Sequence, residues 1–229
     1  MEMNSSPILY SLHNCPYAIR ARFALLKAQQ SVLIRSIKLD NKPVEMLNAS
    51  PKGSVPVLVI PSIGLQESAT LGEALVLDES LDIIVWSLSQ SDPDDLLRKD
   101  DPTALPKMMD FIHQFEQEFN PALNAFGCAK RYHEENEQDL RDKCSIELAK
   151  LEALLSRHPY LFSDRESLVD IAVMPFLRKF ARIDKQWFRI CPYPRLRQWL
   201  NGYVQSTMFS KVMKNYPLWL ECREDYCFG

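Results

Sequence analysis

Short apolar runs and segments of helical periodicity alternate between residues 7 and 60. The apolar runs are bounded by turn-forming residues and predict strands at "PILY" (7–10), "SVLIRSIKL" (31–39) and "SVPVLVI" (54–60). Pro16 opens a segment with alanines at helical spacing, and Pro43 begins "PVEMLNA", so both segments are predicted to be helices. The order strand, helix, strand, helix, strand predicts a parallel pair of strands.

The pattern becomes irregular between residues 61 and 101. "PSIGLQESATLGE" (61–73) predicts a long loop, "ALVLDES" (74–80) a fourth strand, and "SLDIIVWSLSQ" (80–90) a helix. Acidic residues and prolines then gather without apolar periodicity. We therefore expect a linker over residues 91–101.

The rest of the chain has a helical pattern. Apolar residues recur at i, i+3, i+4 and i+7 over 102–123, 135–156, 167–183 and 194–206. Ser167 and Asp170 have the spacing of a box that caps the start of a helix. The sequence thus predicts an α/β domain over 1–90 and an all-helical domain over 102–229.

Composition and charge limit the partners. A chain of 229 residues with 46% hydrophobic content can bury a sizeable core. Its net charge of −3, without a basic run, argues against nucleic acid and membrane partners. The N-terminus lacks the features of a signal peptide, so we expect a cytoplasmic protein. The six cysteines are scattered, which predicts reduced thiols and no metal site.

The stretch "LYSLHNCPYAIRARFAL" (9–25) places Cys15 directly before Pro16 at a predicted helix start. A helix N-terminus offers N–H donors and a partial positive charge, which stabilise a nucleophilic thiolate. Ala18 stands where a redox pair would have its second thiol. Any disulfide chemistry would therefore use one protein thiol and an external thiol, which in the cytosol points to glutathione. A small residue beside a helix starter is the alternative.

A resemblance to a known family rests on the Cys15 region together with "SPKGSVPVLVI" (50–60) and "VLDESLDII" (76–84). The sequence resembles the glutathione transferase superfamily over nearly its whole length. The "CPYAIRAR" stretch is similar to the cysteine-type, omega-like and glutaredoxin-like branch. The resemblance implies the glutathione transferase fold, in which a thioredoxin-like α/β domain precedes an all-α helical domain. It also implies a homodimer, glutathione as co-substrate and Cys15 as the catalytic thiol.

The resemblance further implies a glutathione site. Lys42 would pair with the glycine carboxylate, and Val55, followed by a cis Pro56, would bind the cysteinyl unit through its backbone. Glu79 and Ser80 would hold the γ-glutamyl group. A second pair, Glu67 and Ser68, fits the family spacing better, whereas Glu79 and Ser80 fit the order of strand, pair and helix. Glu79 and Ser80 are therefore the preferred pair.

Other residues near the thiol have competing interpretations. Tyr10 lies where tyrosine-type transferases keep their catalytic hydroxyl, so it competes with Cys15 for the catalytic role. His13, two residues before the thiol, is either a proton partner or, by preference, a polar lining residue. Both are candidates for the second-substrate pocket. Arg20 and Arg22 are predicted to be solvated surface residues.

Three aromatic residues recur every fourth position in the first predicted helix of the second half. Phe111, Phe115 and Phe119 would line the second-substrate pocket by resemblance, or pack in the core of the helical bundle. The sequence leaves both interpretations open.

The resulting functional hypothesis is thiol transfer, in which Cys15 forms and resolves a mixed disulfide with glutathione. Deglutathionylation and dehydroascorbate-type reduction would share this cycle. Conjugation of glutathione to a small apolar electrophile is an alternative. A non-catalytic binding module with the same fold is a second alternative.

Overall fold

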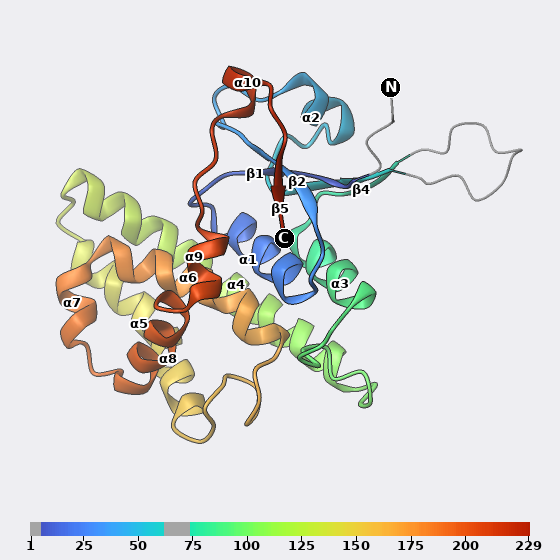
Figure 1. Cartoon of the computed structure of the whole chain (residues 1–229). Helices are drawn as coiled ribbons and strands as arrows, with labels where there is room; N and C mark the ends of the chain where they lie inside the picture. The colour runs from blue at the N-terminus through green and yellow to red at the C-terminus, as the bar shows by residue number, and fades with distance from the viewer. Residues whose placement is uncertain (1–5, 62–73) are drawn as a thin grey trace, which may run out of the picture. The chain divides into compact units, whose positions relative to one another are not determined.

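The computed structural model describes residues 6–61 and 74–229, and Figure 1 shows its ribbon. The chain divides into two compact units. The first unit combines Met1–Pro93 with Lys211–Gly229, and the second consists of Asp94–Ser210. The predicted loop over 61–73 falls almost entirely outside the described residues.

A mixed sheet forms the centre of the first unit. Its strands are β1 (Ile8–Ser11), β2 (Val32–Ser36), β3 (Val57–Ile60), β4 (Leu75–Leu77) and β5 (Tyr226–Phe228), in the order β4-β3-β1-β2-β5. β1 and β2 are parallel, which confirms the predicted parallel pair, and the other pairs are antiparallel.

Helices cover both faces of this sheet. α1 (Pro16–Lys27) and α3 (Ser80–Gln90) pack against each other and lie on one face, and α2 (Val44–Ala49) lies on the other (Figure 1). Because side chains alternate along a strand, Leu9 joins the core under α1 and α3, whereas Tyr10 joins the cluster under α2. Both layers therefore depend on the short apolar strand before Cys15.

The C-terminal end of the chain returns to this sheet. After α10 (Trp219–Cys222), β5 pairs antiparallel with β2, and Leu33 faces Cys227 in the register. The expectation of helical structure up to residue 229 differs from the structure here, because a strand of three residues is too short to give a periodic signal. Burial of Phe228 joins this strand to the same core as Leu9.

The second unit is helical, as predicted. Its helices are α4 (Ala104–Tyr132), α5 (Glu137–Leu155), α6 (Leu168–Ile183), α7 (Lys185–Ile190) and α8 (Pro194–Val204), and α9 (Thr207–Val212) leads out of it. The helical pattern found for each longer segment corresponds to α4, α5, α6 and α8. The long α4 packs against α5 and α6 through the buried positions of its apolar stripe.

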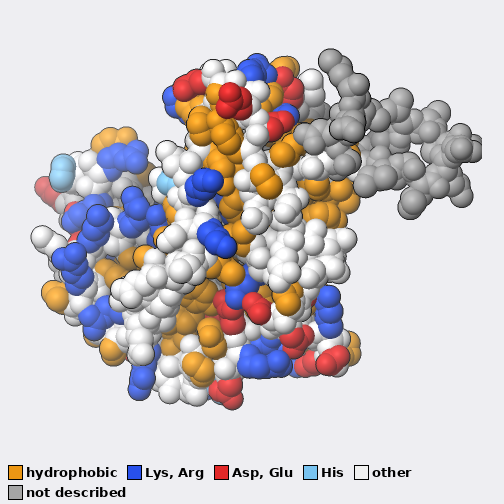
Figure 2. All heavy atoms as spheres, viewed as in Figure 1, with side chains coloured by type: hydrophobic (Ala, Val, Ile, Leu, Met, Phe, Trp, Pro, Cys, Tyr) orange, Lys and Arg blue, Asp and Glu red, His pale blue; other side chains and the backbone are white. Residues whose placement is uncertain are grey.

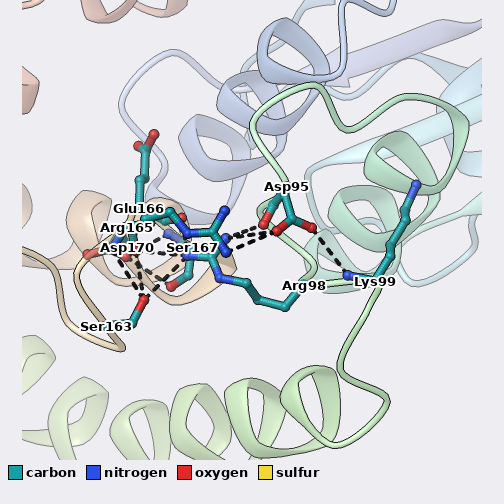
Figure 3. A network of polar contacts seen from close by, with 8 residues as sticks. All are labelled: Asp95, Arg98, Lys99, Ser163, Arg165, Glu166, Ser167 and Asp170. Atoms are coloured by element: carbon teal, nitrogen blue, oxygen red, sulfur yellow. Dashed lines mark hydrogen bonds and ion pairs between the residues drawn. The ribbon is translucent and has the colours of Figure 1, made fainter.

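A polar network fixes the start of α6 (Figure 3). Asp170 is fully buried and accepts hydrogen bonds from the N–H and Oγ of Ser167, each at 2.9 Å, which confirms the predicted capping box. It also accepts from the Leu161 N–H at 2.9 Å and from Nε1 of Trp199 at 3.1 Å. Arg98 donates to the Arg165 and Glu166 carbonyls nearby. These contacts join α6, α8 and the preceding loop.

Candidate functional site

Cys15 stands at the start of α1, as the sequence predicts. It is the N-cap residue, with extended backbone angles (φ −69°, ψ 124°), and Pro16 begins the helix. Its N–H donates to the Leu12 carbonyl at 3.2 Å, and its half-buried Sγ lies 4.0 Å from the Val55 carbonyl oxygen. The thiol therefore sits where the helix N-terminus meets the segment before β3.

The remaining cysteines have different surroundings. All six are free. Burial raises the pKa of the Cys144 thiol to about 12 and also raises that of Cys191, which disfavours a thiolate at either position. Cys128 and Cys227 are exposed. Cys15 alone among them combines partial burial with a position at a helix start within the described residues.

The turn that brings Val55 to the thiol contains a cis peptide bond. The bond between Val55 and Pro56 is cis, as the resemblance implied. Val55 is 9% exposed and belongs to the apolar cluster with Tyr10 and Met46. Packing thus fixes the segment whose carbonyl faces the thiol.

Glu79 and Ser80 begin α3. Glu79 is its N-cap residue, and its exposed carboxylate forms an ion pair with Lys52. Ser80 is 2% exposed and accepts two hydrogen bonds at Oγ from Arg20, from Nε at 3.0 Å and from Nη2 at 2.8 Å. The second Glu–Ser pair, Glu67 and Ser68, lies outside the described residues.

Lys42 lies over the turn that precedes Val55. A Cβ added to Gly53 would come within 3.3 Å of Lys42 Nζ, and Gly53 has a φ of +63°, which favours glycine. Ser50, at the start of this turn, donates through Oγ to Asp78 Oδ2 at 2.7 Å. This turn therefore joins the neighbourhood of Lys42 to the residue before Glu79.

Sequence reasoning missed Ser50, Lys52 and Asp78 in this region. Each stands within a few positions of a predicted site residue, and the "SPKG" and "DES" stretches contain them. Their contacts join segments that are distant along the chain, as the pairs Lys52–Glu79 and Ser50–Asp78 show. A local sequence pattern does not indicate such pairings.

The prediction that Arg20 and Arg22 are solvated is wrong. Each is 2% exposed. Arg20 donates to Ser80, and Arg22 donates to the Ser11 hydroxyl and to the His13 and Val212 carbonyls. Arginine can be buried when its several N–H groups find acceptors, and α1 places both guanidinium groups among such acceptors.

Tyr10 and His13 are both engaged by other groups. Tyr10 is 2% exposed, and its hydroxyl oxygen accepts a hydrogen bond from Arg35 Nη1 at 2.9 Å. Burial raises the pKa of this hydroxyl, although Arg35 opposes the effect. His13 donates from Nε2 to the Met213 carbonyl at 3.0 Å, because that oxygen can only accept.

The aromatic residues of α4 lie in the second unit. Phe115 is 3% exposed and Phe119 is fully buried; their rings stack with centroids 4.9 Å apart. They also contact Phe176 and Phe180 of α6. These contacts favour packing in the helical core for Phe115 and Phe119, whereas Phe111 is only half-buried.

Over residues 6–61 and 74–229, no group of three or more His, Cys, Asp or Glu side chains gathers as metal ligands would. Within the same ranges, no helix combines the length and the apolar character that crossing a membrane requires.

Comparison with known sequences identifies both halves of the chain. The family model described as "Glutathione S-transferase, N-terminal domain" matches residues 9–95, and the corresponding C-terminal domain matches 147–202. Glutathione S-transferase omega-1 of Mus musculus is 26% identical over 205 residues, which cover 88% of this chain and 78% of the mouse protein. The Sus scrofa protein of the same name is 26% identical over 210 residues, 89% of this chain and 79% of the pig protein.

Solved structures share the fold. A glutathione transferase family member from Pseudomonas fluorescens, solved with two glutathione molecules bound, has a TM-score of 0.76 at 17% identity, over 93% of this chain and 94% of its own. Glutathione transferase Omega 2C from Trametes versicolor has a TM-score of 0.71 at 20% identity, over 92% of this chain and 94% of its own. The first unit has the thioredoxin-like α/β fold, and the second unit is helical. A domain model of the same family, the glutathione S-transferases, matches each half of the chain. The chain belongs to the glutathione S-transferase superfamily.

Proposed function

We propose that this protein is a cysteine-type glutathione transferase that transfers thiols through a mixed disulfide on Cys15. The observation that carries the proposal is the position of the Cys15 sulfur, at the N-terminus of α1 and 4.0 Å from the Val55 carbonyl before a cis proline. Helix N-termini bind anions through their N–H groups, and a thiolate is the form of a cysteine that attacks disulfides.

The charged side chains of Lys42, Lys52 and Glu79 are complementary to glutathione, which carries two carboxylates and one ammonium group. In the proposed complex, Lys42 pairs with the glycine carboxylate, and the Val55 backbone bonds the cysteinyl unit as a neighbouring strand would. Ser80 accepts from Arg20 at Oγ, so its own hydrogen can be donated to the γ-glutamyl carboxylate.

Glu79 supplies the negative charge for the γ-glutamyl ammonium group. Its ion pair with Lys52 is solvent-exposed, with both side chains more than two-fifths exposed, so exchange for a ligand ammonium costs little. Lys52 would then remain close to the γ-glutamyl carboxylate. This arrangement supports Glu79 and Ser80, rather than Glu67 and Ser68, as the binding pair.

The reaction has two exchange steps. The Cys15 thiolate forms a bond to the glutathionyl sulfur of a mixed disulfide, and the substrate leaves as a thiolate that takes a proton from water. A second glutathione thiolate then attacks the same glutathionyl sulfur, and Cys15 leaves as a thiolate. The substrate thiol is reduced, and the glutathionyl group taken from the substrate leaves with one free glutathione as glutathione disulfide.

Conjugation to an electrophile is the competing activity. In that reaction a protein hydroxyl or thiol would support the thiolate of bound glutathione. Tyr10, the candidate of the tyrosine type, is buried and already bound by Arg35, which argues against this role. Thiol transfer therefore fits the site better than conjugation by a tyrosine mechanism.

The test measures adduct formation and turnover with a glutathionylated peptide as substrate. We expect the native protein to gain one glutathionyl group by mass and to release the peptide thiol. Cys15→Ser should abolish both, while Cys128→Ser, which changes an exposed cysteine of α4, should leave both unchanged. Retained turnover in Cys15→Ser would refute the mechanism, and conjugation of chlorodinitrobenzene by that variant would support the competing activity.

We also propose a cellular location and an oligomeric state for this protein. Free glutathione as second substrate requires a reducing compartment, and the six free cysteines are compatible with one, so we propose a cytoplasmic location. We further propose a homodimer, following the family resemblance. Light scattering of the purified protein measures its mass directly, and a monomer mass at micromolar concentration would rule out a stable dimer.

A further inference from the structure

The loop that leads from β1 to Cys15 is bound by a buried guanidinium group of α1. Arg22 donates from Nη1 to Ser11 Oγ at 2.5 Å and from Nη2 to the His13 carbonyl at 2.7 Å. The Cys15 N–H donates to the Leu12 carbonyl in the same loop. The orientation of Cys15 at the helix start therefore depends on a loop that Arg22 holds.

The C-terminal segment binds both Arg22 and the same loop. Nε of Arg22 donates to the Val212 carbonyl at 2.9 Å, and His13 donates from Nε2 to the Met213 carbonyl at 3.0 Å. Arg22 thus bridges the loop and the C-terminal segment with one side chain that is 2% exposed.

The rest of this segment is fastened to the sheet of the same unit. β5 pairs with β2, and Arg35 forms an ion pair with Asp225 at 2.6 Å. The guanidinium groups of Arg35 and Arg223 lie 4.2 and 4.4 Å from the ring of Trp219. Figure 2 shows acidic and basic side chains close together around α10. These contacts hold Val212 and Met213 in position against the loop.

We propose that Arg22 is a positioning residue, which with Val212 and Met213 of the C-terminal segment fixes the Ser11–His13 loop and so the reactive orientation of Cys15. This inference rests on the proposed role of Cys15. Lysine cannot replace Arg22. The three nitrogens of the planar guanidinium group reach acceptors on both segments at once, whereas an ammonium group donates all its hydrogens from one nitrogen.

The first test compares Arg22→Lys with the native protein in two separate measurements. The rate of Cys15 adduct formation with a glutathionylated peptide should fall about tenfold, because a small displacement of a reacting group has a large effect on rate. The dissociation constant for S-methylglutathione, an unreactive analogue, should stay within twofold, because Arg22 donates to Ser11, His13 and Val212, none of which is a proposed glutathione-binding residue. Arg189→Lys, at an exposed position of α7, is the matched control.

A second variant distinguishes the positioning role from a loss of folding. His13→Phe keeps a ring of similar size and removes only the hydrogen bond to Met213, so it should also slow adduct formation while the circular dichroism stays native. For Arg22→Ala, added methylguanidinium should restore part of the rate, which a general loss of stability would not allow.

The outcomes separate this inference from the proposed function. A native protein that forms no adduct on Cys15 refutes the proposed function. A native protein that forms the adduct, together with Arg22→Lys and His13→Phe variants that form it at the native rate, refutes the positioning role alone. A parallel rise in the dissociation constant for S-methylglutathione would assign Arg22 to the binding site instead and overturn the inference.

Discussion

Nε and Nη2 of Arg20 both donate to Oγ of Ser80, at 3.0 and 2.8 Å, and each side chain is 2% exposed. A guanidinium group of α1 therefore fixes the first residue of α3. The two helix starts that carry Cys15 and Ser80 are connected through the interior of the unit. Arg20 thus connects α1, the helix that begins after the proposed nucleophile, to Ser80 of the proposed γ-glutamyl site.

Replacing Ser80 tests this connection and the choice between the two Glu–Ser pairs. Ser80→Ala should weaken binding of S-methylglutathione by about 1.5 to 3 kcal/mol, because a hydrogen bond to a charged ligand is lost. Isothermal titration calorimetry measures this change. Ser68→Ala is the matched control and should bind normally. The opposite pattern would transfer the γ-glutamyl site to Glu67 and Ser68.

Tyr10→Phe should leave thiol transfer within about twofold of native, since the Tyr10 hydroxyl is bound by Arg35 and buried. The free energy of unfolding should fall by about 1 kcal/mol, the usual contribution of one hydrogen bond. Steady-state kinetics and urea denaturation give the two values. A hundredfold loss of activity in a folded variant would restore Tyr10 as a catalytic candidate.

Asp170→Ala should reduce the free energy of unfolding by about 3 kcal/mol or more, because it leaves buried donors of Ser167, Leu161 and Trp199 without their acceptor. Urea denaturation measures the loss. Asp164→Ala changes an aspartate of the preceding loop whose side chain is 81% exposed, and it should cost less than about 0.5 kcal/mol. Equal losses in the two variants would contradict the structural role of the capping box.

Acid should weaken attachment of the C-terminal segment. The hydrogen bond from Arg35 lowers the pKa of Asp225 below its usual value. A carboxyl group with a lowered folded pKa stabilises the protein above its ordinary pKa of about 3.9, and this contribution is lost as the pH falls through the folded pKa. Asp225→Asn should therefore be less stable than native by about 1 kcal/mol at pH 7, for a partly exposed pair.

The difference between native protein and Asp225→Asn should shrink as the pH is lowered from 6 toward the folded pKa of Asp225. Urea denaturation over this range measures it. Asp142→Asn, an exposed position of α5, should show no comparable pH-dependent difference. A constant gap between native protein and Asp225→Asn at every pH would exclude the ion pair as its origin.

The sequence allowed prediction of features that depend on local pattern. Apolar periodicity located the longer helices, the Cys–Pro pair marked the start of α1, and the family resemblance implied the cis bond before Pro56. The buried state of Arg20 and Arg22 was missed because their acceptors stand on other elements; for Arg22 one acceptor lies 190 positions away. Phe115 and Phe119 show the same limit, since periodicity places them on one helix face without telling what covers it.

β5 has a consequence for synthesis of the protein. The ribosome makes Tyr226–Phe228 only after the whole of residues 94–210, so the outer edge of β2 stays unpaired while the helical unit is being made. An open strand edge is a template for pairing with other chains. During this interval the nascent chain is exposed to misassembly at the edge of β2, and the sheet is completed only after the helical unit has been made.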